Sequence, residues 1–160
     1  KSRRLPVFHH LEPGEGEAGL DDAWTKVVDG RPVSADRIER KGRSIVVPKA
    51  TSDAARFTFS QLCDAPLGAS DYLAIADKYP TIFIDKVPEI KRGDRNRAKR
   101  FILLVDVLYD KHNRLFLSAE VPIEDIYAAG TGTEKFEFAR TVSRLTEMQD
   151  EAYLDSSRAA

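Results

Sequence analysis

Residues 81–121 read "TIFIDKVPEIKRGDRNRAKRFILLVDVLYDKHNRLFLSAEV". Residues 81–87 and 114–121 are apolar runs with β-branched and aromatic side chains, which is typical of strands. The stretch between them, 95–111, has apolar residues at helical spacing. A strand, a helix and a strand in this order predict a right-handed β-α-β unit whose two strands are neighbours and parallel. This unit decides the fold class.

One face of the expected helix is apolar, and it carries Phe101, Leu104, Val105 and Leu108. We therefore expect this face to pack in the core. Asp106 would lie on the opposite face. The sequence "ILLVD" that ends at Asp106 is thus not the apolar strand ending in aspartate that holds magnesium in nucleoside triphosphatases.

The sequence "TIFID" also ends in an aspartate, and here a strand is expected. Asp85 is followed by Lys86, whereas a second acid is expected next to the magnesium-binding aspartate of an ATPase. We therefore interpret Asp85 as a solvated charge at the end of a strand.

The flanking sequence completes an α/β fold. Residues 43–48 ("RSIVVP") and 55–60 ("ARFTFS") predict two strands that form a short hairpin. Residues 68–79 ("GASDYLAIADKY") predict a helix that stops before Pro80. A C-terminal helix is expected over 137–154. The predicted architecture is a short β-hairpin followed by a βαβ unit with parallel strands and a C-terminal helix.

The N-terminal part has a different composition. Residues 1–32 are rich in glycine, proline and charge, and a short helix is plausible over 21–28. We expect a flexible or partly helical connector over 1–40 and an α/β segment over 41–160.

Composition excludes several classes of function. The 160 residues include 25 basic and 26 acidic ones, so the net charge of -1 gives no overall attraction to nucleic acid or to an anionic membrane. Cys63 is the single cysteine and cannot form an internal disulfide; we interpret it as a small core residue. No apolar run approaches the roughly 20 residues of a membrane helix. A cytoplasmic protein without an integral membrane segment is expected.

Short motifs for phosphate and metal are absent or misplaced. The sequence has no G-x-x-x-x-G-K-[ST] loop. "GEGEAG" at 14–19 fits the dinucleotide fingerprint by letter, but no strand of adequate length precedes it. No histidine and cysteine cluster has the spacing of a metal site. The chain alone is therefore expected to bind no metal and no nucleotide cofactor.

Two arginines stand on one face of the C-terminal helix. Arg140 and Arg144 are four positions apart in "EFARTVSRLTEMQDEAYL". They could form ordinary helix ion pairs, Arg140 with Glu137 and Arg144 with Glu147, each worth about 0.2–0.5 kcal/mol. Alternatively they could bind phosphate, since a guanidinium meets two phosphate oxygens at once. The apolar stripe of the same helix leaves both arginines off the core face. Spacing alone leaves both interpretations open.

Four stretches together resemble one protein family. They are "FTFSQLCDAPLGASDYLAIA", "TIFIDKVP", "AKRFILLVDVLYD" with "RLFLSAEVP", and "FARTVSRLTEMQDEAYL". Their pattern is similar to the C-terminal region of the AAA+ type P-loop ATPases typified by the bacterial cell-division ATPase ZapE and its mitochondrial relatives. The similarity extends over residues 41–154. The chain therefore resembles a fragment of a P-loop ATPase.

This resemblance implies a function for the complete protein. ATP hydrolysis with Mg²⁺ would drive work on protein clients, in cell division or protein quality control, by a homo-oligomer in the bacterial cytoplasm, peripherally at the inner membrane, or in mitochondria. The Walker A and B motifs of such proteins precede the matched region, so we expect no ATP turnover by this segment alone. Arg140 and Arg144 would contact nucleotide phosphate in the assembled enzyme. The alternative is a non-catalytic protein-interaction module.

Overall fold

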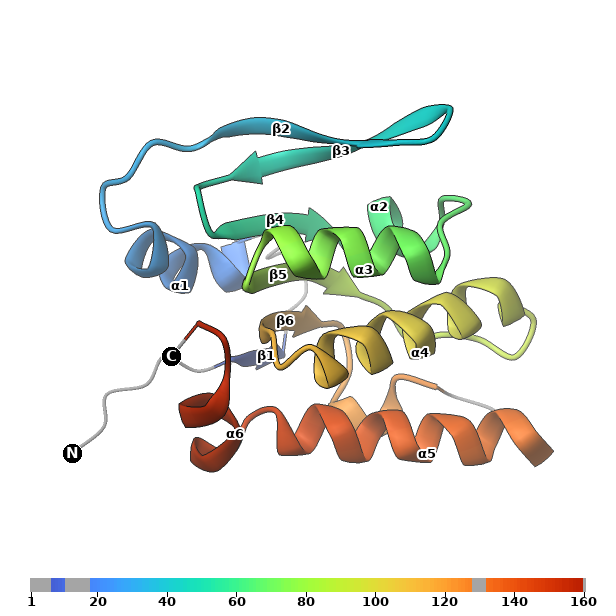
Figure 1. Ribbon diagram of the computed structural model, residues 1–160. Coiled ribbons are helices and arrows are strands. Elements are labelled where there is room, and N and C mark those ends of the chain that lie inside the picture. The colour runs from blue at the N-terminus through green and yellow to red at the C-terminus, as the bar shows by residue number, and fades with distance from the viewer. Residues whose placement is uncertain (1–6, 11–17, 128–131, 160) are drawn as a thin grey trace.

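The computed structural model describes residues 7–10, 18–127 and 132–159. Their strands form a six-stranded sheet in the order β1-β6-β5-β4-β3-β2, with helices packed against it (Figure 1). The strands are β1 (Phe8–His10), β2 (Ser34–Arg40), β3 (Arg43–Ala50), β4 (Ala54–Thr58), β5 (Thr81–Val87) and β6 (Arg114–Ala119). The helices are α1 (Ala18–Val28), α2 (Phe59–Cys63), α3 (Ala69–Lys78), α4 (Arg95–Asp110), the 3-10 turn η1 (Ile123–Asp125), α5 (Gly132–Glu147) and α6 (Glu151–Ser156).

The predicted β-α-β unit is confirmed. β5 and β6 are neighbouring parallel strands, with Thr81 opposite Arg114 and Ile84 opposite Leu117. α4 connects them and packs beside α3 (Figure 1). The apolar face of α4 is buried as expected, because Leu104 is fully inaccessible to solvent, as are its three apolar neighbours on that face: Phe101, Val105 and Leu108.

The two faces of the sheet are covered by different helices. Trp24 of α1 packs edge-on against Phe83 at 5.0 Å, and Phe83 stacks on Phe116 at 4.4 Å. Leu117, the next residue of β6, lines a small apolar hollow with Leu145 of α5. Because successive residues of a strand point to opposite faces, α1 covers one face of the sheet and α5 lies on the other.

The burial of Leu104 gives a stability prediction. Leu104→Ala removes a side chain from the centre of the packing between α4 and the rest of the core, and neighbouring atoms cannot fully close the space. We expect the free energy of unfolding to fall by about 2–5 kcal/mol. Urea denaturation of the wild-type and variant chains measures this loss. The exposed Leu73 of α3 is the control, and its alanine variant should lose far less. Equal stability of wild type and Leu104→Ala would contradict the placement of α4.

The predicted hairpin is also present. β3 and β4 are antiparallel, and β4 then pairs with β5 in parallel. The expected connector over 1–40 contains two strands of the sheet. β2 pairs with β3, and β1 pairs with β6. The expected boundary at residue 40 falls in the turn between β2 and β3, where Gly42 has a φ of +74°, a conformation that favours glycine.

The C-terminal helix is two helices rather than one. α5 ends at Glu147, and α6 begins at Glu151 after a turn in which Asp150 has extended backbone angles. This break departs from the single helix expected over 137–154. Asp150 precedes α6 in the extended conformation typical of a helix N-cap, but its side chain makes no capping hydrogen bond.

Candidate functional site

α5 packs along α4 through aromatic and aliphatic side chains. Phe138 stacks on Phe101 with ring centres 6.2 Å apart and contacts Tyr127 at 5.2 Å. Leu145 and Met148 continue the same buried stripe. This packing fixes the rotation of α5, so that the two predicted arginines lie beside α4 rather than in the core.

Arg140 and Arg144 meet at one carboxylate. Arg144 Nη1 donates to Asp106 Oδ1 at 2.5 Å, and Arg140 Nη2 donates to Asp106 Oδ2 at 3.3 Å. Asp106 belongs to α4, as the helical periodicity of that segment predicted. Two guanidinium groups therefore share a single carboxylate.

The two arginines are held to different degrees. The Arg144 guanidinium also lies over the ring of Tyr109 at 4.8 Å, and its side chain is 24% exposed. The Tyr109 hydroxyl in turn donates to Glu147 Oε1 at 2.8 Å, and this bond raises the pKa of Tyr109. Arg140 has the longer bond to Asp106, and its side chain is 56% exposed. Arg144 is thus anchored by two contacts, whereas the more exposed Arg140 is held by its bond to Asp106.

The expected helix ion pairs are wrong. In the described part of the chain, the acid that pairs with Arg140 and Arg144 is Asp106 and not Glu137 or Glu147. Glu147 accepts a hydrogen bond from Tyr109 instead. The geometric reason is that α5 packs on α4, which brings an acid from a distant stretch of sequence closer than the acids along α5 itself.

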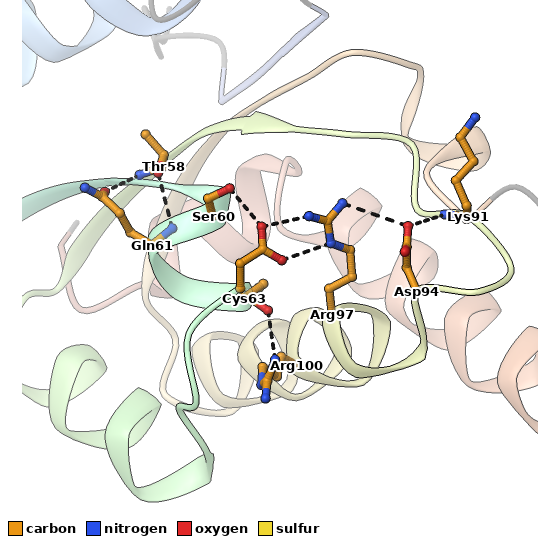
Figure 2. Close-up of polar contacts among 9 residues, drawn as sticks. Thr58, Ser60, Gln61, Cys63, Lys91, Asp94, Arg97 and Arg100 are labelled. Carbon is orange, nitrogen blue, oxygen red and sulfur yellow. Dashed lines mark hydrogen bonds and ion pairs between the residues drawn. The ribbon is translucent and has the colours of Figure 1, made fainter.

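A second polar cluster joins α2 to the start of α4 (Figure 2). Arg97 donates twice to the Asp64 carboxylate, at 3.0 and 2.7 Å, and Ser60 Oγ donates to the same group at 2.8 Å. Burial alone would raise the pKa of Asp64, but the bonds from Arg97 and Ser60 outweigh it and lower the pKa. Arg100 donates to the Cys63 carbonyl at 3.2 Å. These contacts fix the start of α4 against α2.

The same segment forms a basic surface that our sequence analysis missed. Residues 91–100 ("KRGDRNRAKR") contain six basic residues and one acid. Lys91, Arg92 and Lys99 are exposed. The signal was visible as a local charge run, but the nearly neutral total charge concealed it.

Cys63 is fully buried, as its interpretation as a core residue required. It ends α2, a five-residue helix whose N-terminus is closed by a capping box between Thr58 and Gln61 (Figure 2). Burial raises the pKa of the Cys63 thiol. Because the thiolate is the reactive form of cysteine, both the burial and the raised pKa disfavour reaction at this thiol.

The interpretation of Asp85 as a solvated charge is wrong. Its side chain is 1% exposed and accepts two bonds from the 2% exposed Arg56, at 2.7 Å from Nε and 3.0 Å from Nη2. Arg56 also pairs with Asp21 of α1 at 2.8 Å. Burial alone would lower the pKa of Arg56, but these carboxylates outweigh it and raise the pKa. Arg56 and Asp85 lie on adjacent parallel strands, a pairing that sequence order did not reveal.

The described residues contain neither a metal-binding cluster nor a membrane-spanning helix. No three histidine, cysteine, aspartate or glutamate side chains come together in an arrangement that could hold a metal ion. Within the same residues, no helix has the length and apolar character needed to cross a membrane.

Comparison with known proteins establishes the family. The sequence profile described as "AFG1-like ATPase" matches residues 2–157, which is nearly the whole chain. The chain belongs to the AFG1-like ATPase family. This confirms the resemblance seen in the four sequence stretches, and the α/β sheet with its parallel β4-β5-β6 core agrees with a fragment of such an ATPase.

Individual members of the AFG1-like family match along most of this chain. The cell division protein ZapE of Escherichia coli is 34% identical over 88% of this chain and 37% of its own length. An uncharacterised protein of Schizosaccharomyces pombe is 35% identical over 78% of this chain and 33% of its own. Lactation elevated protein 1 homolog B of Danio rerio is 33% identical over 71% and 28%. The chain thus spans about a third of the length of these relatives. No solved structure shows significant similarity to it.

Proposed function

We propose that this chain is the C-terminal portion of an ATPase that couples ATP hydrolysis to work on protein clients. Three observations support the proposal: the AFG1-like family assignment, the similarity to a cell division protein, and the coverage of only about a third of each relative. The remainder of the protein would build the Walker A and B motifs and bind ATP and Mg²⁺. This segment would supply arginines to that site.

The pair of arginines on Asp106 carries the proposal. A planar guanidinium binds two oxygens of a phosphate at once, and arginines that meet the transferring phosphoryl group stabilise its charge. Arg140 is more than half exposed and retains one long bond to Asp106. That bond uses one nitrogen of the guanidinium, so its other N–H groups can meet phosphate oxygens while Asp106 holds Arg140 and Arg144 side by side.

The same proposal includes the partners and the compartment. A homo-oligomer would let the arginines act within one subunit or across a subunit boundary, as arginine fingers do when supplied in cis or in trans. Protein clients of cell division or quality control would be the substrates of the mechanical work. We place the bacterial protein in the cytoplasm or peripherally at the inner membrane, and a eukaryotic one in mitochondria.

Nucleotide binding by the isolated chain tests where the phosphate site lies. We expect titration calorimetry of the 160-residue chain with Mg·ATP to show no binding at micromolar concentration, because the loop that holds the phosphates belongs to the remainder of the protein. The full-length protein titrated under the same conditions is the positive control. Micromolar affinity of the isolated chain would contradict the proposal, since the phosphate site would then lie within these residues.

The exposed basic surface supports a second candidate, a non-catalytic protein-interaction module. Lys91, Arg92 and Lys99 could bind an acidic partner without any nucleotide. Sequencing the gene upstream of Lys1 separates the two candidates. A glycine-rich loop ending in lysine, followed by an apolar strand ending in Asp-Glu, favours the ATPase. An unrelated domain there favours the interaction module.

A further inference from the structure

The contacts around Asp106 point to a role that rests on the proposed function. We propose that Asp106 is a positioning residue that holds Arg140 and Arg144 side by side for the nucleotide phosphate. It would not itself touch the nucleotide. Its carboxylate accepts one bond from each arginine on separate oxygens, Oδ1 from Arg144 and Oδ2 from Arg140.

The Asp106 carboxylate offsets the repulsion between the two guanidinium groups. Two guanidinium groups one helical turn apart on α5 repel each other, and like charges at this spacing disfavour a shared orientation. The Asp106 carboxylate lies between them and draws both to the same side of α5. Its side chain is 21% exposed, so water only partly screens these attractions. Without the negative charge, the arginines should spread into solvent in different directions.

Contacts beside Asp106 already hold one of the two arginines, Arg144, in place. Tyr109, on the same helix as Asp106, supports the Arg144 guanidinium at 4.8 Å from the ring centre, and Glu147 fixes the Tyr109 hydroxyl. Among the described residues, the contact that orients the Arg140 guanidinium is its bond to Asp106. The rate effect of Asp106 should therefore operate mainly through Arg140.

The test is a double-mutant cycle in the full-length protein. Asp106→Asn keeps the shape of the side chain and removes its charge, and we expect kcat for ATP hydrolysis to fall by about 10- to 100-fold, as misplacement of a catalytic group does. Combined with Arg140→Ala, the same substitution should slow the enzyme little further, because the group that it positions is gone. Asp106→Glu should recover much of the rate. Asp110→Asn, on the same helix and exposed, is the matched control and should not change kcat.

A second readout separates positioning from a general loss of structure. Equilibrium binding of a transition-state analogue, ADP with aluminium fluoride, should weaken by a similar factor in Asp106→Asn while the melting midpoint stays within a few degrees of wild type. Multiplicative rate losses in the Asp106→Asn, Arg140→Ala double variant would overturn the inference, because they show that the two residues act independently. A normal rate in Asp106→Asn would also overturn it. If the arginine variants themselves hydrolyse ATP normally, the proposed function fails first.

Discussion

ATP turnover by the full-length protein should fall by about 10³–10⁵-fold when Arg140 is replaced by alanine, the range observed for arginines that meet a transferring phosphoryl group. The melting midpoint should change little, because the bond that is lost belongs to an exposed side chain, and Asp106 keeps its bond to Arg144. Steady-state hydrolysis and a melting curve of each variant measure the two effects. A large loss of rate without a loss of stability is the expected signature.

Three further variants sharpen this result. Arg140→Lys keeps the charge but cannot bind two phosphate oxygens as the planar guanidinium does. Its activity should therefore be little higher than that of Arg140→Ala. Arg144→Ala should also slow hydrolysis, with a larger change in melting midpoint than Arg140→Ala because Arg144 stacks on Tyr109. Arg37→Ala is the control, since Arg37 is exposed and donates to Ser44 on the neighbouring strand. Normal turnover in both the Arg140 and Arg144 alanine variants would leave these arginines as structural partners of Asp106.

Removal of the buried carboxylate of Asp85 should cost about 3–5 kcal/mol of folding free energy. Asp85→Ala removes the 2.7 and 3.0 Å bonds between this carboxylate and the 2% exposed guanidinium of Arg56, while the exposed Asp21 still contacts Arg56 at 2.8 Å. A buried charge that loses its buried partner costs far more than the loss of a surface ion pair. Urea denaturation of the isolated chain, fitted to a two-state transition, measures the difference.

Two control variants separate charge burial from packing. Asp21→Ala removes a carboxylate from the same arginine, but Asp21 is 60% exposed, so its loss should cost less than about 1 kcal/mol. Replacement of both partners by apolar residues, Arg56→Met with Asp85→Leu, should recover most of the stability, because no unpaired charge remains. If Asp85→Ala is as stable as wild type, the pair is not buried as described.

The fold was largely predictable because its decisive signals are local. The alternation of apolar runs and one helical stripe over residues 81–121 specified the parallel strands β5 and β6 and the helix between them. The extent of the sheet at its N-terminal end was not predictable in this way. β1 and β2 are short or highly charged strands, and "SADRIER" in β2 has few of the β-branched and aromatic residues that mark a strand. Pairing with β3 stabilises β2, although its own sequence has few strand-forming residues.

The site was only half predictable, for a related reason. Spacing along α5 identified Arg140 and Arg144, but their partner Asp106 comes from another helix, and no rule of spacing along one helix could find it. Asp85 was misjudged in the same way, because Arg56 precedes it by 29 residues and reaches it only through the parallel pairing of β4 and β5. Charges that pair across elements require the tertiary structure.

We propose that these arginines reach a nucleotide held by the rest of the protein. The most direct measurement is a structure of the full-length protein with Mg²⁺, ADP and aluminium fluoride bound. We expect a guanidinium nitrogen of Arg140 about 3 Å from a fluoride at the position of the transferring phosphoryl group, in the same or a neighbouring subunit, with both arginines still bound to Asp106. A structure in which other residues surround the phosphoryl position and Arg140 lies too far away to contact the fluoride would contradict this role.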